Sequence, residues 1–131
     1  MGYGITTTLD RPFGEAVSAV RDALAGQGFG IVSEIDMAAT LKAKLDVDIP
    51  PQIILGACNP SLAHRALKVE QSIGLLLPCN VVVRGTGEGT CVVEALDPQV
   101  MVTVTDNEGL RSVADEAAQR LRAAIDSLAQ V

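Results

Sequence analysis

Apolar residues in this chain recur either every three or four positions or every second position. The chain changes from one spacing to the other several times along its length. The segment FGEAVSAVRDAL (residues 13–24) repeats them every three or four positions, which is typical of a helix with one buried face. The segment TCVVEAL (residues 90–96) places Cys91, Val93 and Ala95 on one face, which is typical of a half-buried strand. A chain with both patterns must pack helices against a sheet, so we expect an α+β fold.

The patterns predict the order β-α-β-α-β-α-β-β-β-α within one compact domain that spans residues 1–131. The glycines of GTGEG (residues 85–89) predict a hairpin turn, and the β-branched residues of VMVTVT (residues 100–105) predict the last strand. We expect a mixed or antiparallel sheet with helices packed on one face. The expected strands are residues 4–9, 29–35, 52–57, 74–84, 90–96 and 100–105, and the expected helices are about 13–24, 37–45, 60–69 and 107–128.

Charge balance and aromatic content argue against nucleic acid as a partner. The net charge is −6 and the ten Lys and Arg residues are scattered, whereas a protein that binds a phosphate backbone carries a basic face. Two Phe, one Tyr and no Trp leave few rings on which bases could stack.

The sequence also predicts no membrane span and no secretory signal. The longest apolar stretch, residues 73–83, is interrupted by Pro78 and Asn80 and is too short to cross a bilayer. The start of the chain has no basic segment followed by an apolar one, so we expect a cytoplasmic location. In a reducing compartment the three cysteines are expected to be thiols, and a redox pair of Cys58 and Cys79 stays open.

Two of the three cysteines precede an asparagine and lie close to a proline, in ACNP and in LLLPCNVVV. In ACNP, Asn59 is predicted to cap a helix that begins at Pro60. Cys58 would then lie at the positive end of that helix, where a thiol becomes nucleophilic and an anion can bind. The alternative is that Cys58 is a small buried residue, as free cysteines commonly are.

In LLLPCNVVV, Pro78 interrupts an extended apolar segment just before Cys79 and Asn80. Proline donates no backbone hydrogen bond, so it predicts a bulge or a sheet edge at this point. A bulge can turn Cys79 and Asn80 toward a site. The alternative is that Asn80 binds nearby backbone while Cys79 packs in the core, where Cys91 is also expected.

Two cysteines and a histidine would suit a soft metal ion or zinc. His64 is the only histidine and lies about one helical turn from Cys58, so the candidate metal ligands are Cys58, Cys79 and His64. No C-x-x-C or H-x-x-x-H spacing accompanies them, and a solvent-exposed His64 is the alternative.

A second polar group consists of Glu34, Asp36 and Lys42. The two carboxylates are separated by one residue and so share a strand face, where they could line a polar pocket with Lys42. Asp36 is explained equally well as a helix cap. The glycines of residues 85–89 open no helix and so do not match a phosphate loop. No catalytic motif is recognisable, so the sequence predicts neither a particular enzymatic activity nor a particular cofactor.

The segments EIDMAATLKAKL, ILGACNPSLAHRALKVEQSIGLLLPCNVVV and EALDP resemble the bacterial and archaeal family called domain of unknown function 302. The resemblance extends over residues 3–128. It implies a compact α+β domain and association as dimers, without an established activity. The Asn-Pro and Leu-Pro pairs match the core that the family shares, and Cys58 and Cys79 match a cysteine-bearing subgroup.

Three functions are compatible with the sequence. The first is a small-ligand-binding module with its site near the helix start and the strand break. The second is a thiol-redox or soft-metal-binding protein, and the third is a structural or regulatory homodimer, because an exposed sheet edge can pair with a second copy. The candidate ligand-binding residues are Glu34, Asp36, Lys42, Cys58, Asn59, Cys79 and Asn80.

Overall fold

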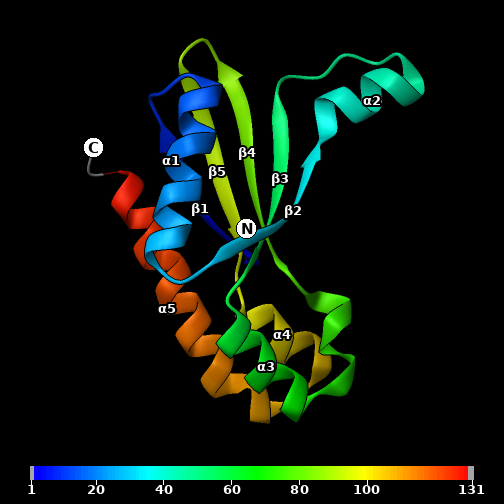
Figure 1. Cartoon of the computed structure of the whole chain (residues 1–131), viewed down its shortest axis with the longest axis vertical. Coiled ribbons are helices and arrows are strands. Elements are labelled where there is room, and N and C mark those ends of the chain that lie inside the picture. The colour runs from blue at the N-terminus through cyan, green and yellow to red at the C-terminus, as the bar shows by residue number, and fades with distance from the viewer. Residues whose placement is uncertain (1, 130–131) are drawn as a thin grey trace.

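Within residues 2–129, which this computed structural model describes, five strands form one sheet in the order β1-β5-β4-β3-β2 (Figure 1). All neighbouring strands are antiparallel, which confirms the predicted α+β class with an antiparallel sheet. The strands are β1 (Gly4–Leu9), β2 (Gly30–Asp36), β3 (Gln52–Cys58), β4 (Cys79–Gly87) and β5 (Thr90–Leu96).

Helices cover one face of this sheet and extend past both ends of its strands. They are α1 (Phe13–Gly26), α2 (Met37–Leu45), α3 (Pro60–Val69), α4 (Gln99–Thr105) and α5 (Arg111–Leu128), with short 3₁₀ helices η1 (Gln71–Leu76) and η2 (Glu108–Leu110). α1 and α5 lie on the covered face, α3 and α4 lie beyond one end of the strands, and α2 projects beyond the other end (Figure 1). None of the helices in the described part of the chain is long and apolar enough to cross a membrane.

The strand prediction for residues 100–105 is wrong, because this segment belongs to α4. The observed order is therefore β-α-β-α-β-α-β-β-α-α, apart from the 3₁₀ helices. The Asp97 carboxylate accepts a hydrogen bond from the Gln99 N–H at 3.0 Å, at the start of this helix. Met101 and Val102 are buried against other helices. Tertiary burial thus overrides the preference of β-branched residues for strands.

Residues 74–76 also differ from the predicted extended segment, because they end η1. Ile73 in this 3₁₀ helix is completely buried, and β4 begins only at Cys79, after Pro78. The last predicted helix is confirmed from Arg111 onward, and the residues just before it form η2.

Buried apolar side chains form two clusters, which α5 connects. The sheet cluster lies between the covered face of the sheet and helices α1 and α5. It contains Ile5, Leu9, Ala16, Val20, Leu24, Phe29, Ile53, Leu55, Ala57, Cys79, Val81, Val83, Cys91, Val93, Ala95, Leu121, Ala124, Ile125 and Leu128. The helical cluster joins α3, η1, α4 and the first half of α5. It contains Leu62, Ala66, Ile73, Met101, Val102, Leu110, Val113, Ala114 and Ala117.

The opposite face of the sheet, here called the open face, carries the alternate side chains of the same strands. Ile54 and Val82 lie opposite each other there and are only half-buried. The Arg84 Nε donates to the Glu94 Oε1 at 3.0 Å on this face, across the β4–β5 pair. The covered face thus forms the core, while the open face presents aliphatic side chains, the Arg84–Glu94 ion pair and polar side chains such as Thr6.

Candidate functional site

The end of β3 places Cys58 directly at the start of α3. Asn59 is the N-cap of this helix, and its Oδ1 accepts a hydrogen bond from the Leu62 N–H at 3.3 Å. Pro60 occupies the first turn, where a missing N–H costs nothing. The capping prediction for Asn59 is therefore confirmed. Cys58 is half-buried and lies at the positive end of a helix of ten residues.

The start of β4 brings Cys79 beside the end of β3. Cys79 pairs with Ala57 in the antiparallel register, so it lies diagonally across from Cys58. Its side chain points to the covered face and is 8% exposed. Two thiols that are 21 positions apart in the sequence therefore lie on adjacent strand ends.

Gly56 permits this close approach, because a side chain there would collide with its neighbours. A β-carbon on Gly56 would lie 2.8 Å from the Pro78 Cγ and 2.1 Å from the Ser33 Oγ. Both distances are shorter than van der Waals contact allows. A glycine at this position lets Pro78 close against β3, which sets where Cys79 enters the sheet.

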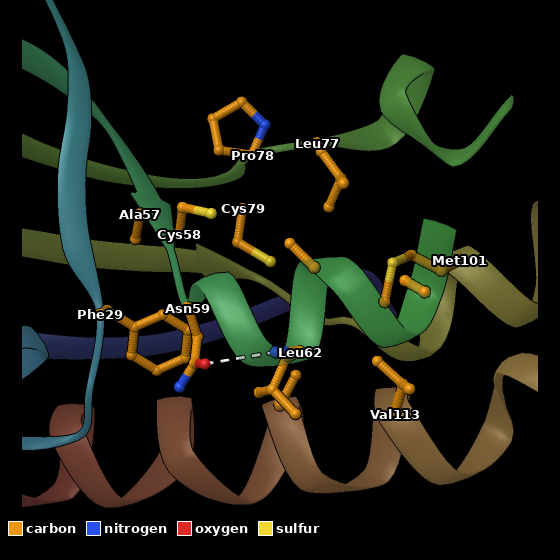
Figure 2. Close-up of a pocket in the computed structure, with 13 residues that line it drawn as sticks. Phe29, Ala57, Cys58, Asn59, Leu62, Leu77, Pro78, Cys79, Met101 and Val113 are labelled. Atoms are coloured by element: carbon orange, nitrogen blue, oxygen red, sulfur yellow. Dashed lines mark hydrogen bonds between the residues drawn. The ribbon is translucent and has the colours of Figure 1, made fainter. Parts of the chain in front are cut away.

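A cavity of about 30 Å³ lies at the junction of the sheet cluster and the helical cluster (Figure 2). It is large enough for one or two water molecules. Of the seven candidate ligand-binding residues, it brings together Cys58, Asn59 and Cys79. The remaining lining is almost entirely apolar and comes from Phe29, Ala57, Leu62, Ala63, Ala66, Leu77, Pro78, Met101, Val113 and Ala117.

Burial in these apolar surroundings raises the pKa of the Cys79 thiol to about 11, and the nearby negative charge of an ionised Cys58 adds to this shift. The thiol of Cys79 is therefore protonated at neutral pH. Cys91, the third cysteine, lies elsewhere on the covered face with its side chain fully buried. Its S–H donates to the Arg11 carbonyl oxygen at 3.4 Å, and burial also raises its pKa. The core position expected for Cys91 is confirmed.

Met101 contributes a third sulfur atom to the cavity lining, and the sequence patterns do not single it out. It is 4% exposed and belongs to the helical cluster. The sequence patterns predict a strand for residues 100–105, so they do not place Met101 beside the cysteines. Met101 reaches the core only because this segment forms the helix α4. The only signal in the sequence is its residue type, a thioether in an apolar segment.

Asn80 lies on the other side of the sheet from Cys79, because neighbouring residues in a strand point to opposite faces. It is exposed and lines a shallow depression of about 280 Å³ on the open face, together with Tyr3, Val82 and Glu94 among others. The second Cys-Asn pair is thus divided between the cavity and the open face.

His64 is exposed on α3 and does not line the cavity that contains Cys58 and Cys79. Within residues 2–129, no group of three His, Cys, Asp or Glu side chains is arranged to hold a metal ion. Cys58 and Cys79 are therefore the members of the predicted metal set that the structure brings together.

The predicted polar group of Glu34, Asp36 and Lys42 lies at the β2–α2 end of the molecule, and each member has a local partner. Glu34 forms an ion pair with Arg21 of α1. The Asp36 carboxylate accepts from the Ala39 N–H at 2.9 Å, which confirms it as the cap of α2. The Lys42 Nζ lies 2.7 Å from Asp46 and 3.4 Å from Asp48 carboxylate oxygens.

The fold and the sequence agree with one family. The family model described as "Domain of unknown function DUF302" matches residues 5–128. A crystal structure of an uncharacterized conserved protein DUF302 from Bacillus stearothermophilus is similar, with a TM-score of 0.87 and 27% sequence identity over 96% of this chain and 98% of that one. No curated protein matches this chain. The chain therefore belongs to the DUF302 family.

Proposed function

We propose that this protein is a small-ligand-binding module whose ligand is a soft metal ion, held between Cys58 and Cys79 at the start of α3. The observation that supports it is the cavity, since two cysteines from separate segments line the same small space. Thiolates are the protein ligands that soft metal ions prefer. The positive end of α3 would also favour the negative charge that two thiolates bring.

The size of the cavity supports an ion rather than an organic molecule. Pockets for small organic ligands have volumes of roughly 300–1,000 Å³. The cavity here measures about 30 Å³. A metabolite would have to displace packed side chains of both clusters, whereas a single ion occupies far less space.

A reversible disulfide between the same two cysteines is the alternative function, and the structure favours it less. Thiol–disulfide exchange requires a thiolate, whose fraction falls as the pKa rises. With its pKa raised to about 11, Cys79 is almost entirely protonated at neutral pH. A metal ion overcomes this, because coordination displaces the thiol proton.

Silver(I) is a suitable probe, since it is thiophilic and does not change oxidation state in air. Native mass spectrometry of the reduced protein is expected to show one ion per chain. Cys58→Ala and Cys79→Ala should each abolish this binding, whereas Cys91→Ala should retain it, because Cys91 lies away from the cavity. Unchanged binding by Cys58→Ala, or its loss in Cys91→Ala, would refute the assignment of the site.

We also propose that two copies associate through the open face of the sheet. Ile35 is 46% exposed on this face, next to half-buried Ile54 and Val82, so aliphatic side chains cross three strands. The ion pair between Arg84 and Glu94 leaves the centre of the face without net charge. A second copy of a chain with a net charge of −6 would meet no uncompensated charge at this centre.

Light scattering after size exclusion tests this association. The wild-type protein is expected to be a dimer, and Val82→Glu should make it a monomer by placing a charge in the middle of the interface. Gln119→Glu adds the same charge to an exposed position on α5 and should leave the dimer intact. A wild-type monomer at high micromolar concentration would remove this proposal without affecting the metal site.

A further inference from the structure

We propose that the ion is copper(I) and that the Met101 thioether is its third ligand, beside the thiolates of Cys58 and Cys79. This inference rests on the proposed function and adds the identity of the ion and one ligand. The three sulfur-bearing residues come from the end of β3, the start of β4 and helix α4, and all of them line the same cavity.

The position of Met101 supports a role beyond packing. Its side chain is 4% exposed and extends from α4 toward α3, where it lines the same cavity as the two cysteines, nearer the other end of α3 (Figure 2). Cys79 belongs to the sheet cluster and Met101 to the helical cluster, so an ion between them would join the two clusters. The cavity marks the place where the packing of the two clusters leaves a space.

The chemistry of the lining selects copper(I) among biologically common ions. Thiolate and thioether sulfur are soft ligands that favour copper(I). Zinc prefers four ligands in structural sites, and the described residues supply no third His, Cys, Asp or Glu beside the two cysteines. Copper(I), in contrast, is satisfied by two or three sulfur ligands.

Binding is balanced in charge and protons. Each cysteine gives up its thiol proton to solvent as its copper–sulfur bond forms, while the thioether binds through a lone pair and loses nothing. Copper(I) with two thiolates carries a net charge of −1, and no electron is transferred. The N-terminal end of α3, which begins directly after Cys58 and Asn59, offsets this negative charge.

The test is a competition titration of the reduced, full-length protein with copper(I) and a chromophoric chelator under argon. Wild-type protein is expected to bind one copper(I) per chain. Met101→Leu keeps nearly the same volume but removes the sulfur, so it should still bind copper(I), with an affinity lower by about tenfold or more. Met37→Leu is the matched control, because Met37 begins α2 at the opposite end of the sheet and should bind as the wild type does.

X-ray absorption spectroscopy gives a readout that a packing role would not change. The copper in wild-type protein should have three sulfur ligands, and the copper in Met101→Leu should have two. Equal affinity and equal sulfur count in both would refute the role of Met101, while loss of binding in Cys58→Ala would still support the proposed cysteine site. A wild-type protein that binds neither silver(I) nor copper(I) would overturn both the proposed cysteine site and the role of Met101 in it.

Discussion

The sheet cluster and the helical cluster both include residues of α5, yet their packing differs where they meet. Leu55, three residues before the end of β3, is completely buried in the sheet cluster. Cys58, the last residue of the same strand, is half-buried beside a cavity of about 30 Å³. A single strand therefore contributes both to a closely packed core and to an incompletely filled junction. The difference predicts that stability and the proposed ion binding depend on separate residues a few positions apart.

The largest expected effect comes from truncating the sheet cluster. Leu55→Ala should lower the free energy of unfolding by about 3–5 kcal/mol, because a completely buried leucine leaves a cavity that its neighbours cannot fill. Leu77→Ala, at the half-buried lining of the junction, should cost only about 1–2 kcal/mol. Urea unfolding of Leu55→Ala, Leu77→Ala and the wild type measures both losses of unfolding free energy. Equal losses would show that the junction is packed as closely as the sheet cluster.

The pH dependence of stability tests the environment of Cys79 in the metal-free protein. Its pKa is raised to about 11 in the folded state, from an ordinary value near 9.0. Folding thus favours the neutral thiol, so its contribution to stability is complete below about pH 9 and is lost as the pH rises toward 11. A shift of this size corresponds to about 2–3 kcal/mol.

Urea unfolding of the reduced protein at about pH 8 and pH 10.5 measures how much the free energy of unfolding falls between the two pH values. Comparison with Cys79→Ala separates the part due to Cys79 from that of other groups that titrate in this range. The variant should lose less stability than the wild type over this range. Cys91→Ala provides a second comparison, because burial raises the pKa of Cys91 as well. The same pH dependence in wild type and Cys79→Ala would contradict a thiol held in an apolar junction.

Two alanines on the covered face of the sheet allow a direct test of filled and unfilled space. Ala95 and Ala57 are each 1% exposed, but only Ala57 lines the cavity. Ala95→Val should destabilise the protein by about 1–3 kcal/mol through overpacking. Ala57→Val should cost less than about 1 kcal/mol, because its added methyl groups can enter the cavity. Thermal unfolding measures the stability of both variants. A larger loss of stability in Ala57→Val than in Ala95→Val would show that the space beside Ala57 is already filled.

Most of the fold could be predicted from the sequence because periodicity reports which face of an element is buried. The strand at Thr90–Leu96 and the helix stripe in residues 13–24 follow this rule and are found as predicted. Residues 100–105 do not follow this rule. Their β-branched side chains favour a strand, but the burial of Met101 against α3 and α5 requires a helix. Local preference could not reveal a contact between distant segments.

The candidate site could be predicted only in part, for the same reason. The motifs ACNP and LLLPCNVVV identified Cys58, Asn59 and Cys79, because Pro60 begins a helix and Pro78 directly precedes a strand. The predicted bulge or sheet edge at Pro78 is wrong, since β4 is a central strand that pairs with β3 in continuous register. The pairing of Ala57 with Cys79, which joins the two motifs, depends on the sheet register. Asn80 faces away because alternation along β4 separates it from Cys79, and Glu34, Asp36 and Lys42 have partners at the other end of the sheet.

The smallest expected effect concerns the cap that links β3 to α3. Asn59→Ala removes the acceptor for the Leu62 N–H and should cost about 1 kcal/mol, whereas Asn59→Asp keeps an acceptor and should cost less. Asp36→Ala removes the equivalent bond of α2, a helix with no buried residue, so α2 should fray without a comparable loss of global stability. Urea unfolding compares the three variants, and amide hydrogen exchange reports fraying within each helix. If Asp36→Ala cost as much as Asn59→Ala, α2 would have to be part of the cooperative core, and its exposed position would need a partner outside the chain.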